Sequence, residues 1–157
     1  MSISPLPEHG VLIRLNTMGI YFIGDSGSGK SETALQLIHQ GAQLVCDDAP
    51  ELSLKNNTII GTCPDGFHGK MHIHDLGIIN IKKVIGQHAF VKQSKIDFVF
   101  NLTKTKTYSP CSPRQLLYAN QQQWQFQQCF VSGIGIHLYP NRDIATIINT
   151  AINYYLF

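Results

Sequence analysis

The sequence has few charged residues and almost no excess of either sign. Aspartate, glutamate, lysine and arginine make up 14% of the 157 residues, and their formal net charge is +2. Binding to nucleic acid or to an anionic membrane surface depends on a concentrated basic patch. Lys82 and Lys83, like Lys104 and Lys106, form short clusters typical of solvated edges, so we expect neither kind of partner.

Long apolar runs and cysteine pairs are also missing. No run approaches the roughly 18 consecutive apolar residues of a membrane-spanning helix, and the first ten residues lack the features of a secretory signal. Cys46, Cys63, Cys111 and Cys129 form no C-x-x-C pair, which argues against a zinc ribbon or a disulfide framework. We therefore expect a cytoplasmic protein with reduced, mostly buried cysteines.

The length and the 43% hydrophobic content fit one packed domain spanning residues 1–157. Apolar periodicity predicts strands at residues 11–15, 19–23, 43–46, 51–54, 58–62, 71–74, 78–81, 96–102, 129–132 and 134–138. It predicts helices at residues 30–40 and 112–123, and a last helix after Pro140 and Asn141. Several connections are too short for a crossover helix, so we expect an α/β fold with a mixed sheet flanked by helices.

The glutamine-rich stretch at residues 121–128 has two interpretations. Its composition could belong to a low-complexity linker. Trp124 and Phe126 lie within it, however, and two large aromatic side chains favour an ordered surface.

A phosphate-binding loop is the clearest motif in the sequence. Residues 24–31 read GDSGSGKS and fit G-x-x-x-x-G-K-[ST] at every fixed position, between a predicted strand and a predicted helix. Backbone amides in such a loop surround the β-phosphate, while Lys30 bridges the β- and γ-phosphates and Ser31 binds Mg²⁺. No N-K-x-D string follows, so ATP is favoured over GTP. The residues expected to contact the nucleotide are Gly24, Asp25, Ser26, Gly27, Ser28, Gly29, Lys30, Ser31 and Glu32.

Two adjacent carboxylates follow the strand predicted at residues 43–46. Asp47 and Asp48 could hold the metal ion or orient the attacking oxygen, and they point to opposite faces if the strand continues. A solvated acidic turn before Pro50 is the alternative. His72 and His74 share a strand face and could bind a metal ion, but no third ligand completes a familiar spacing. An exposed strand is therefore favoured there.

At this point the sequence resembles a known family, the catalytic domain of HPr kinase/phosphorylase. His9 to Leu12 is similar to the family's H-G-V-L opening, and residues 24–35 (GDSGSGKSETAL) to its extended phosphate loop. Residues 44–48 (LVCDD) resemble its L-V-A-D-D segment, and residues 76–81 (LGIINI) part of its signature. Pro140, Asn141 and Arg142 resemble the P-G-R stretch before its final helix.

This resemblance implies a fold related to phosphoenolpyruvate carboxykinases and a short form without the additional N-terminal domain of many members. It also implies hexamers and phosphorylation of a serine on the phosphocarrier HPr. Asp47 would be the general base, and Asp48 and His9 would complete the active site. Asp48 would join Ser31 at the metal ion, while Arg142 would lie near the protein substrate.

One segment departs from the family. Its signature runs L-E-I-R-G-L-G, whereas residues 71–77 read MHIHDLG, so His72 and His74 replace an acidic and a basic residue. We therefore expect an ATP- and Mg²⁺-dependent protein-serine kinase acting on an HPr-like carrier, with weak or absent phosphorolysis. Such a kinase would regulate carbon metabolism or the phosphotransferase system. A nucleotide-binding regulatory module without transfer activity and a small-molecule kinase are the alternatives.

Overall fold

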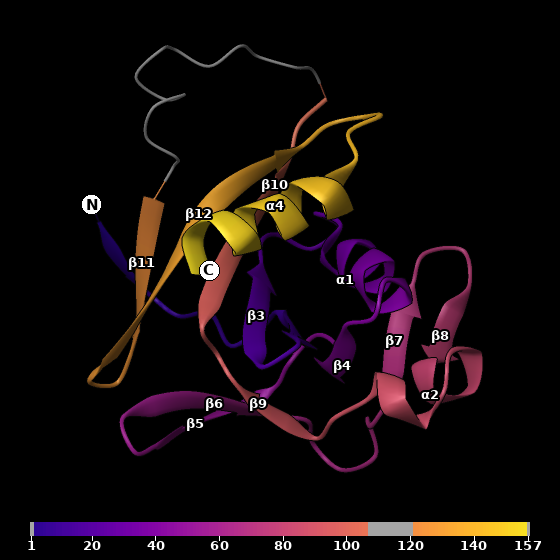
Figure 1. Cartoon of the computed structure of the whole chain (residues 1–157), viewed down its shortest axis with the longest axis horizontal. Coiled ribbons are helices and arrows are strands. Elements are labelled where there is room, and N and C mark those ends of the chain that lie inside the picture. Colours follow the sequence, from indigo (N-terminus) through magenta and orange to yellow (C-terminus); the bar gives the residue numbers. More distant parts are fainter. Residues whose placement is uncertain (1, 107–120, 157) are drawn as a thin grey trace.

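A seven-stranded mixed sheet forms the centre of the computed structural model, which describes residues 2–106 and 121–156 (Figure 1). Its order is β1-β11-β12-β10-β3-β2-β4. The strands are β1 (Ile3–Pro5), β2 (Val11–Leu15), β3 (Met18–Ile23), β4 (Gln43–Cys46), β10 (Phe98–Lys104), β11 (Gln121–Phe126) and β12 (Cys129–Leu138). β10 runs parallel to β3 and β12, whereas β2 runs antiparallel to β3 and β4. The predicted mixed α/β sheet is confirmed.

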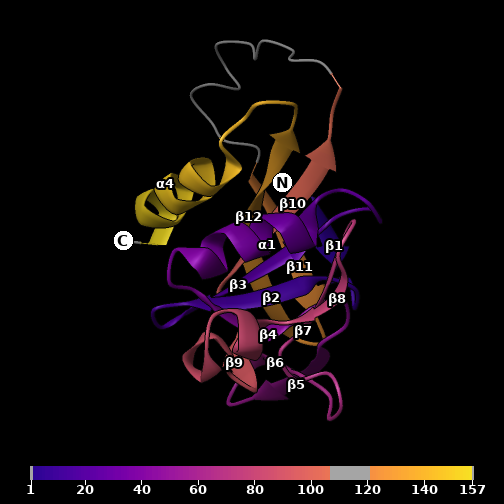
Figure 2. The same cartoon turned by 90° about the vertical axis from the view of Figure 1, so that its right-hand side faces the viewer.

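Two helices cover one face of this sheet, α1 (Lys30–His39) and α4 (Ile144–Leu156) (Figure 2). Phe22 of β3 and Phe100 of β10 are register partners whose rings stack at 5.7 Å beneath the helices. Leu37 of α1 and Ile148 of α4 are fully buried in the same cluster. The apolar face predicted for the last helix is therefore the surface by which α4 packs on the sheet.

The opposite face carries a second apolar cluster and a smaller sheet. The smaller sheet contains β5 (Glu51–Lys55), β6 (Thr58–Thr62) and β9 (Gln93–Lys95), in the order β5-β6-β9. Ile59 of β6 packs there with Tyr21, Val45 and Trp124 from the large sheet. Trp124 is 4% exposed, so the glutamine-rich stretch is an ordered strand rather than a linker.

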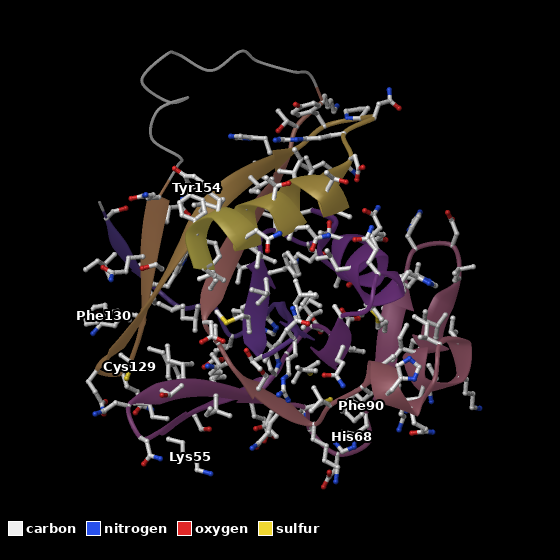
Figure 3. The ribbon with its side chains drawn as sticks, viewed as in Figure 1. Lys55, His68, Phe90, Cys129, Phe130 and Tyr154 are labelled. Atoms are coloured by element: carbon white, nitrogen blue, oxygen red, sulfur yellow. The ribbon has the colours of Figure 1, made fainter. Side chains whose placement is uncertain are left out.

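A peripheral hairpin and two short helical turns lie beside α1 and β4 (Figure 1). They are β7 (Lys70–Ile73), β8 (Gly77–Asn80), α2 (Ile81–Val84) and the 3₁₀ turn η1 (Gln87–Ala89). Figure 3 shows His68 next to Phe90, with ring centroids 5.1 Å apart. Lys82 Nζ lies 5.2 Å from the Phe90 ring centroid, so this ring packs the loop before β7 against α2. No helix among the described residues is long and apolar enough to span a membrane.

The structure corrects several of the predicted elements. The strand predicted at residues 78–81 ends at Asn80, whose side chain caps α2 by accepting a hydrogen bond from Lys82 N–H. The strand predicted at residues 96–102 begins only at Phe98, as β10, because Ile96 and Asp97 connect the small sheet to the large one. The Asp97 amide donates to the Gly19 carbonyl, and Asp97 Oδ2 accepts the Gly19 amide at 2.7 Å.

The third correction concerns the helix predicted at residues 112–123. Residues 121–123 belong to β11 instead, and residues 112–120 lie outside the described part of the chain. The strands predicted at residues 129–132 and 134–138 form one continuous strand, β12. β1, β9, β11, α2 and η1 were not predicted.

Three of the four cysteines fall within the described residues, and all three are free thiols. Cys46 and Cys63 are buried as predicted, and the Cys46 thiol donates to the Asp47 carbonyl at 3.5 Å. Cys129 is partly exposed and donates to the Asn57 carbonyl at 3.2 Å, which ties the β11–β12 hairpin to the β5–β6 turn (Figure 3). Cys111 lies outside the described residues.

Candidate active site

The predicted phosphate loop connects β3 to α1. Gly24, Gly27 and Gly29 all have positive φ, a backbone region in which side chains other than glycine are strained. The Lys30 ammonium folds back along the loop and donates to the carbonyls of Gly24 at 2.9 Å and Asp25 at 3.0 Å. The loop therefore holds its own lysine through two backbone carbonyl oxygens.

The first turn of α1 is open to an anion. Its N-cap is Gly29, which has no side chain to accept hydrogen bonds from the first amides of the helix. Ser28 Oγ is buried in the same turn and has no hydrogen-bond partner within the described residues. The open amides at the start of α1 fit the phosphates of a nucleotide.

Asp47 connects the phosphate loop to the β7–β8 hairpin. It directly follows β4, and its Oδ1 accepts a hydrogen bond from Ser31 Oγ at 2.7 Å. Its Oδ2 accepts the backbone amide of His72 at 2.8 Å. Both carboxylate oxygens are thus engaged by groups of the protein.

Burial raises the pKa of Asp47 above its ordinary value, and Asp48 raises it further. The hydrogen bonds from His72 and Ser31 oppose this rise because they stabilise the charged form. Desolvation is the largest of these effects, so the ionised form of the carboxylate is less stable in the folded protein than in water.

Asp48 has a different environment from its neighbour. Its φ of 78° and the hydrogen bond from Ala49 N–H to the Asp47 carbonyl, at 3.1 Å, make it the central residue of a γ-turn with positive φ. That conformation is strained for an aspartate, and such strain concentrates at functional sites. Asp48 is exposed, so its carboxylate is accessible from outside.

One cavity of about 680 Å³ brings most of the predicted site residues together. Its lining comes from the phosphate loop, the start of α1, the β4 end, the segment before β2 and strand β7. The lining residues are His9, Val11, Gly24, Ser26, Gly27, Gly29, Lys30, Ser31, Glu32, Asp47, Asp48, His72 and His74.

Three predicted site residues do not line the cavity. Asp25 and Ser28 belong to the phosphate loop, but their side chains lie outside the lining. Arg142 also lies outside it: its guanidinium packs 5.0 Å from the Tyr139 ring centroid and donates to the His137 carbonyl at 2.7 Å. Arg142 is therefore not brought together with the two aspartates.

The described residues contain no group of three or more His, Cys, Asp or Glu side chains placed to hold a metal ion. His72 on β7 and His74 just after it are both exposed. Proteins commonly bind Mg²⁺ through one or two side chains together with substrate phosphates.

Sequence reasoning missed the backbone contact between His72 and Asp47. The motifs around the two residues lie 25 positions apart, and an amide donor carries no signal in the sequence. The alternation of exposed and buried residues along β7 could only show that His72 faces outward.

Comparison with known proteins identifies the family of this chain. The family model of the HPr serine kinase C-terminal domain matches residues 4–157. An HPr kinase/phosphorylase of Xylella fastidiosa is 31% identical over 144 residues, and one of Xanthomonas campestris pv. campestris is 30% identical over the same length. Each match covers 91% of this chain but 46% of the relative, so the chain spans about half the length of these curated relatives.

A solved structure shows the same fold. The HPr(Ser) kinase/phosphatase from Coxiella burnetii superposes with a TM-score of 0.82 at 29% sequence identity. The alignment covers 94% of this chain and 88% of the Coxiella chain. The predicted fold class is therefore confirmed by an experimental neighbour as well as by the strand order.

The raised pKa of Asp47 predicts a pH-dependent effect of Asp47→Asn on stability without ligand. The amide can accept from His72 N–H through its oxygen and donate to Ser31 Oγ through its nitrogen, so both contacts survive without a buried charge. A raised carboxyl pKa favours the fold below the ordinary value of about 3.9, and this contribution is lost as the pH rises through the folded-state pKa. Asp47→Asn should therefore unfold at a higher temperature than wild type at pH 7.

Thermal unfolding measured between pH 4 and pH 8 checks this expectation. The advantage of Asp47→Asn should shrink toward pH 4, where the wild-type carboxyl becomes protonated. Asp75→Asn is the matched control, because the Asp75 side chain is 87% exposed. An Asp47→Asn protein that is less stable than wild type at pH 7 would show that the two hydrogen bonds outweigh the cost of burial.

Proposed function

Because the chain belongs to the HPr serine kinase C-terminal domain family, we propose that it is an ATP- and Mg²⁺-dependent protein-serine kinase. Its substrate is an HPr-like phosphocarrier in the cytoplasm, through which it regulates carbon metabolism or the phosphotransferase system. The observation that carries the proposal is the single cavity lined by Lys30, Ser31, Asp47 and Asp48. A phosphate clamp and two carboxylates are the parts that phosphoryl transfer needs. The hexamer implied by the family resemblance belongs to the same proposal.

The phosphate loop and Ser31 hold the nucleotide in this proposal. The loop amides and the start of α1 bind the β-phosphate, and Lys30 offsets the charge that develops between the β- and γ-phosphates. Mg²⁺, when bound, supplies further positive charge to the same oxygens. The Ser31 hydroxyl can offer its lone pairs to the cation while its proton remains directed at Asp47 Oδ1, because that bond is already formed at 2.7 Å.

The contacts of the two aspartates support an exchange of the roles expected from the sequence. Asp47 was expected to be the general base, but both of its oxygens already accept hydrogen bonds. It is therefore better suited to orient Ser31 at the metal side. Asp48 is exposed beside Asp47, within reach of a serine presented by a protein surface. In this assignment Asp48 takes the serine proton while the serine oxygen bonds to the γ-phosphorus and ADP leaves.

His9 and Arg142 have supporting roles in the proposal. His9 lines the cavity, so its imidazole can hydrogen-bond to the transferred phosphoryl group or to Asp48. Arg142 lies outside the cavity and could meet only a substrate that extends beyond it. A contact between Arg142 and the protein substrate therefore stays a prediction.

A nucleotide-binding regulatory module without transfer activity is the second candidate. Its supporting observation is that His72 and His74 line the cavity where the family's signature has an acidic and a basic residue. Phosphoryl transfer to a protein separates the two candidates directly.

The central test is incubation of the protein with ATP, Mg²⁺ and the HPr-like carrier of the same genome, followed by mass measurement. The carrier should gain one phosphate on a serine. Lys30→Ala should abolish most of this transfer and weaken ATP binding, because the phosphate charge loses its cation. Lys83→Ala is the matched control, since Lys83 is exposed and lies outside the cavity lining. ATP binding without any phosphorylation of the carrier would favour the regulatory module.

Replacing each aspartate by asparagine separates their roles. Asp48→Asn should retain ATP binding and lose transfer by roughly 10²- to 10⁴-fold, the usual contribution of one general acid–base group. Asp47→Asn should instead raise the Mg²⁺ concentration needed for half-maximal rate, because Ser31 loses its anionic hydrogen-bond acceptor. Rates measured over a Mg²⁺ titration decide between these outcomes. If Asp47→Asn loses transfer at every Mg²⁺ concentration while Asp48→Asn does not, Asp47 is the base.

The two histidines predict weak or absent phosphorolysis. This reverse reaction must hold inorganic phosphate beside a phosphoserine, which requires positive charge. Neutral His72 is a poor ligand for Mg²⁺, and neutral His74 cannot form the bidentate contacts of an arginine. The double variant His72→Glu, His74→Arg should partly restore phosphate-dependent dephosphorylation of the carrier. Strong wild-type phosphorolysis at pH 8 would contradict this explanation.

A further inference from the structure

Tyr21 places a hydroxyl group in the apolar layer beneath the candidate active site. It lies on β3 with its side chain fully buried, among residues such as Leu12, Val45 and Val99. A buried hydroxyl destabilises the fold unless it is hydrogen-bonded. The Tyr21 hydroxyl donates to the Pro7 carbonyl at 2.9 Å, so its one polar group is used to hold the chain that precedes β2.

The segment from Pro7 to Gly10 is held at both ends. Its first residue accepts the Tyr21 hydroxyl, and its last residue, Gly10, donates its amide to the Asp48 carbonyl. Gly10 also packs directly on the Tyr21 ring, because a Cβ atom added there would lie 2.6 Å from Tyr21 Cζ. His9 lies between the two anchors, with its side chain exposed at the cavity.

The same segment supports the strained turn at Asp48. The γ-turn leaves the Asp48 carbonyl outside any regular ladder, and the Gly10 amide satisfies it. A shift of the segment would therefore displace His9 and at the same time break the hydrogen bond from Gly10 to the Asp48 carbonyl. The two groups are coupled through backbone contacts although 39 positions separate them in the sequence.

We propose that Tyr21 is a positioning residue, whose hydroxyl bond to Pro7 fixes His9 and, through Gly10, the Asp48 turn in the cavity. The predicted effect of Tyr21 on catalysis rests on the kinase function proposed above. Its structural consequence, the anchoring of Gly10, can be measured without catalysis. A phenylalanine would fill the same space, so the inference concerns the hydroxyl alone.

The chemistry of the hydroxyl suits this role. Burial raises the pKa of Tyr21 well above its ordinary value, and the neighbouring Cys46, Glu8 and Asp48 raise it further. The group therefore remains a protonated donor at neutral pH and well above it. Its bond to Pro7 should then hold at every pH at which the catalytic groups titrate.

The test compares Tyr21→Phe with Ser94→Ala. Both variants remove one buried hydroxyl that donates to a backbone carbonyl, but Ser94 donates to Lys95 away from the cavity. Tyr21→Phe should lower kcat for carrier phosphorylation by roughly 3- to 10-fold, the effect of losing one hydrogen bond, and leave the KM for ATP unchanged. Ser94→Ala should change neither quantity.

A double-mutant cycle with His9→Ala distinguishes positioning from general destabilisation. If Tyr21 acts through His9, Tyr21→Phe should reduce kcat much less in the His9→Ala background than in wild type. Equal reductions in both backgrounds, or no reduction in wild type, would overturn the catalytic part of the proposal.

Hydrogen exchange of the Gly10 amide, followed by NMR, tests the anchoring directly. Tyr21→Phe should speed this exchange by roughly 3- to 10-fold relative to wild type and Ser94→Ala, because the segment loses one of its anchors. If wild type does not phosphorylate the carrier, the kinase proposal fails and the anchoring is judged by this exchange alone. Unchanged exchange in Tyr21→Phe would overturn the anchoring.

Discussion

The pair of hydrogen bonds to Asp47 is the contact on which the candidate site depends. One bond comes from Ser31 at the start of α1, and the other from the His72 amide on β7. Without them, the phosphate loop and the β7–β8 hairpin would share only packing contacts along α1. A charge-assisted hydrogen bond is stronger than a neutral one, so an ionised carboxylate is an effective link between two elements. The cost of this link is visible in the raised pKa of Asp47.

Much of the fold could be predicted because its core elements carry strong local signals. The turn at Asn56 and Asn57 has positive φ at both residues, as expected of a two-residue hairpin, and the β5–β6 pair follows from it. α1 ends at His39, and Gly41 follows its C-cap residue Gln40 with positive φ, the conformation for which glycine is preferred at this position. β1 could not be predicted, because its three residues are exposed and it exists only through parallel pairing with β11. The break at Asp97 likewise depends on Gly19, 78 positions away in the sequence.

The part of the candidate site that lies in one continuous sequence motif could be predicted. Lys30 and Ser31 lie within one loop pattern, and the structure brings them to the cavity with Asp47 and Asp48. The two-residue period of a strand predicts that the two aspartates point to opposite faces. It does not predict which of them its neighbours bury. Asp48 also leaves the strand conformation through its positive φ, which no propensity of aspartate requires. The bond from Tyr21 to Pro7 is invisible in the sequence for the same reason, because its acceptor is a backbone carbonyl.

The contact at residue 72 explains how this site tolerates a change of side chain at a position so close to the chemistry. The group that holds Asp47 is the backbone amide, which every residue except proline provides. The His72 side chain points to the other side of the strand from the buried Met71 and Ile73, toward the cavity. Asp47 can thus keep its position whether residue 72 is acidic or an imidazole. The position of the carboxylate is thus independent of the charge that the side chain of residue 72 presents to the cavity, so a substitution there can change that charge without disturbing the fold.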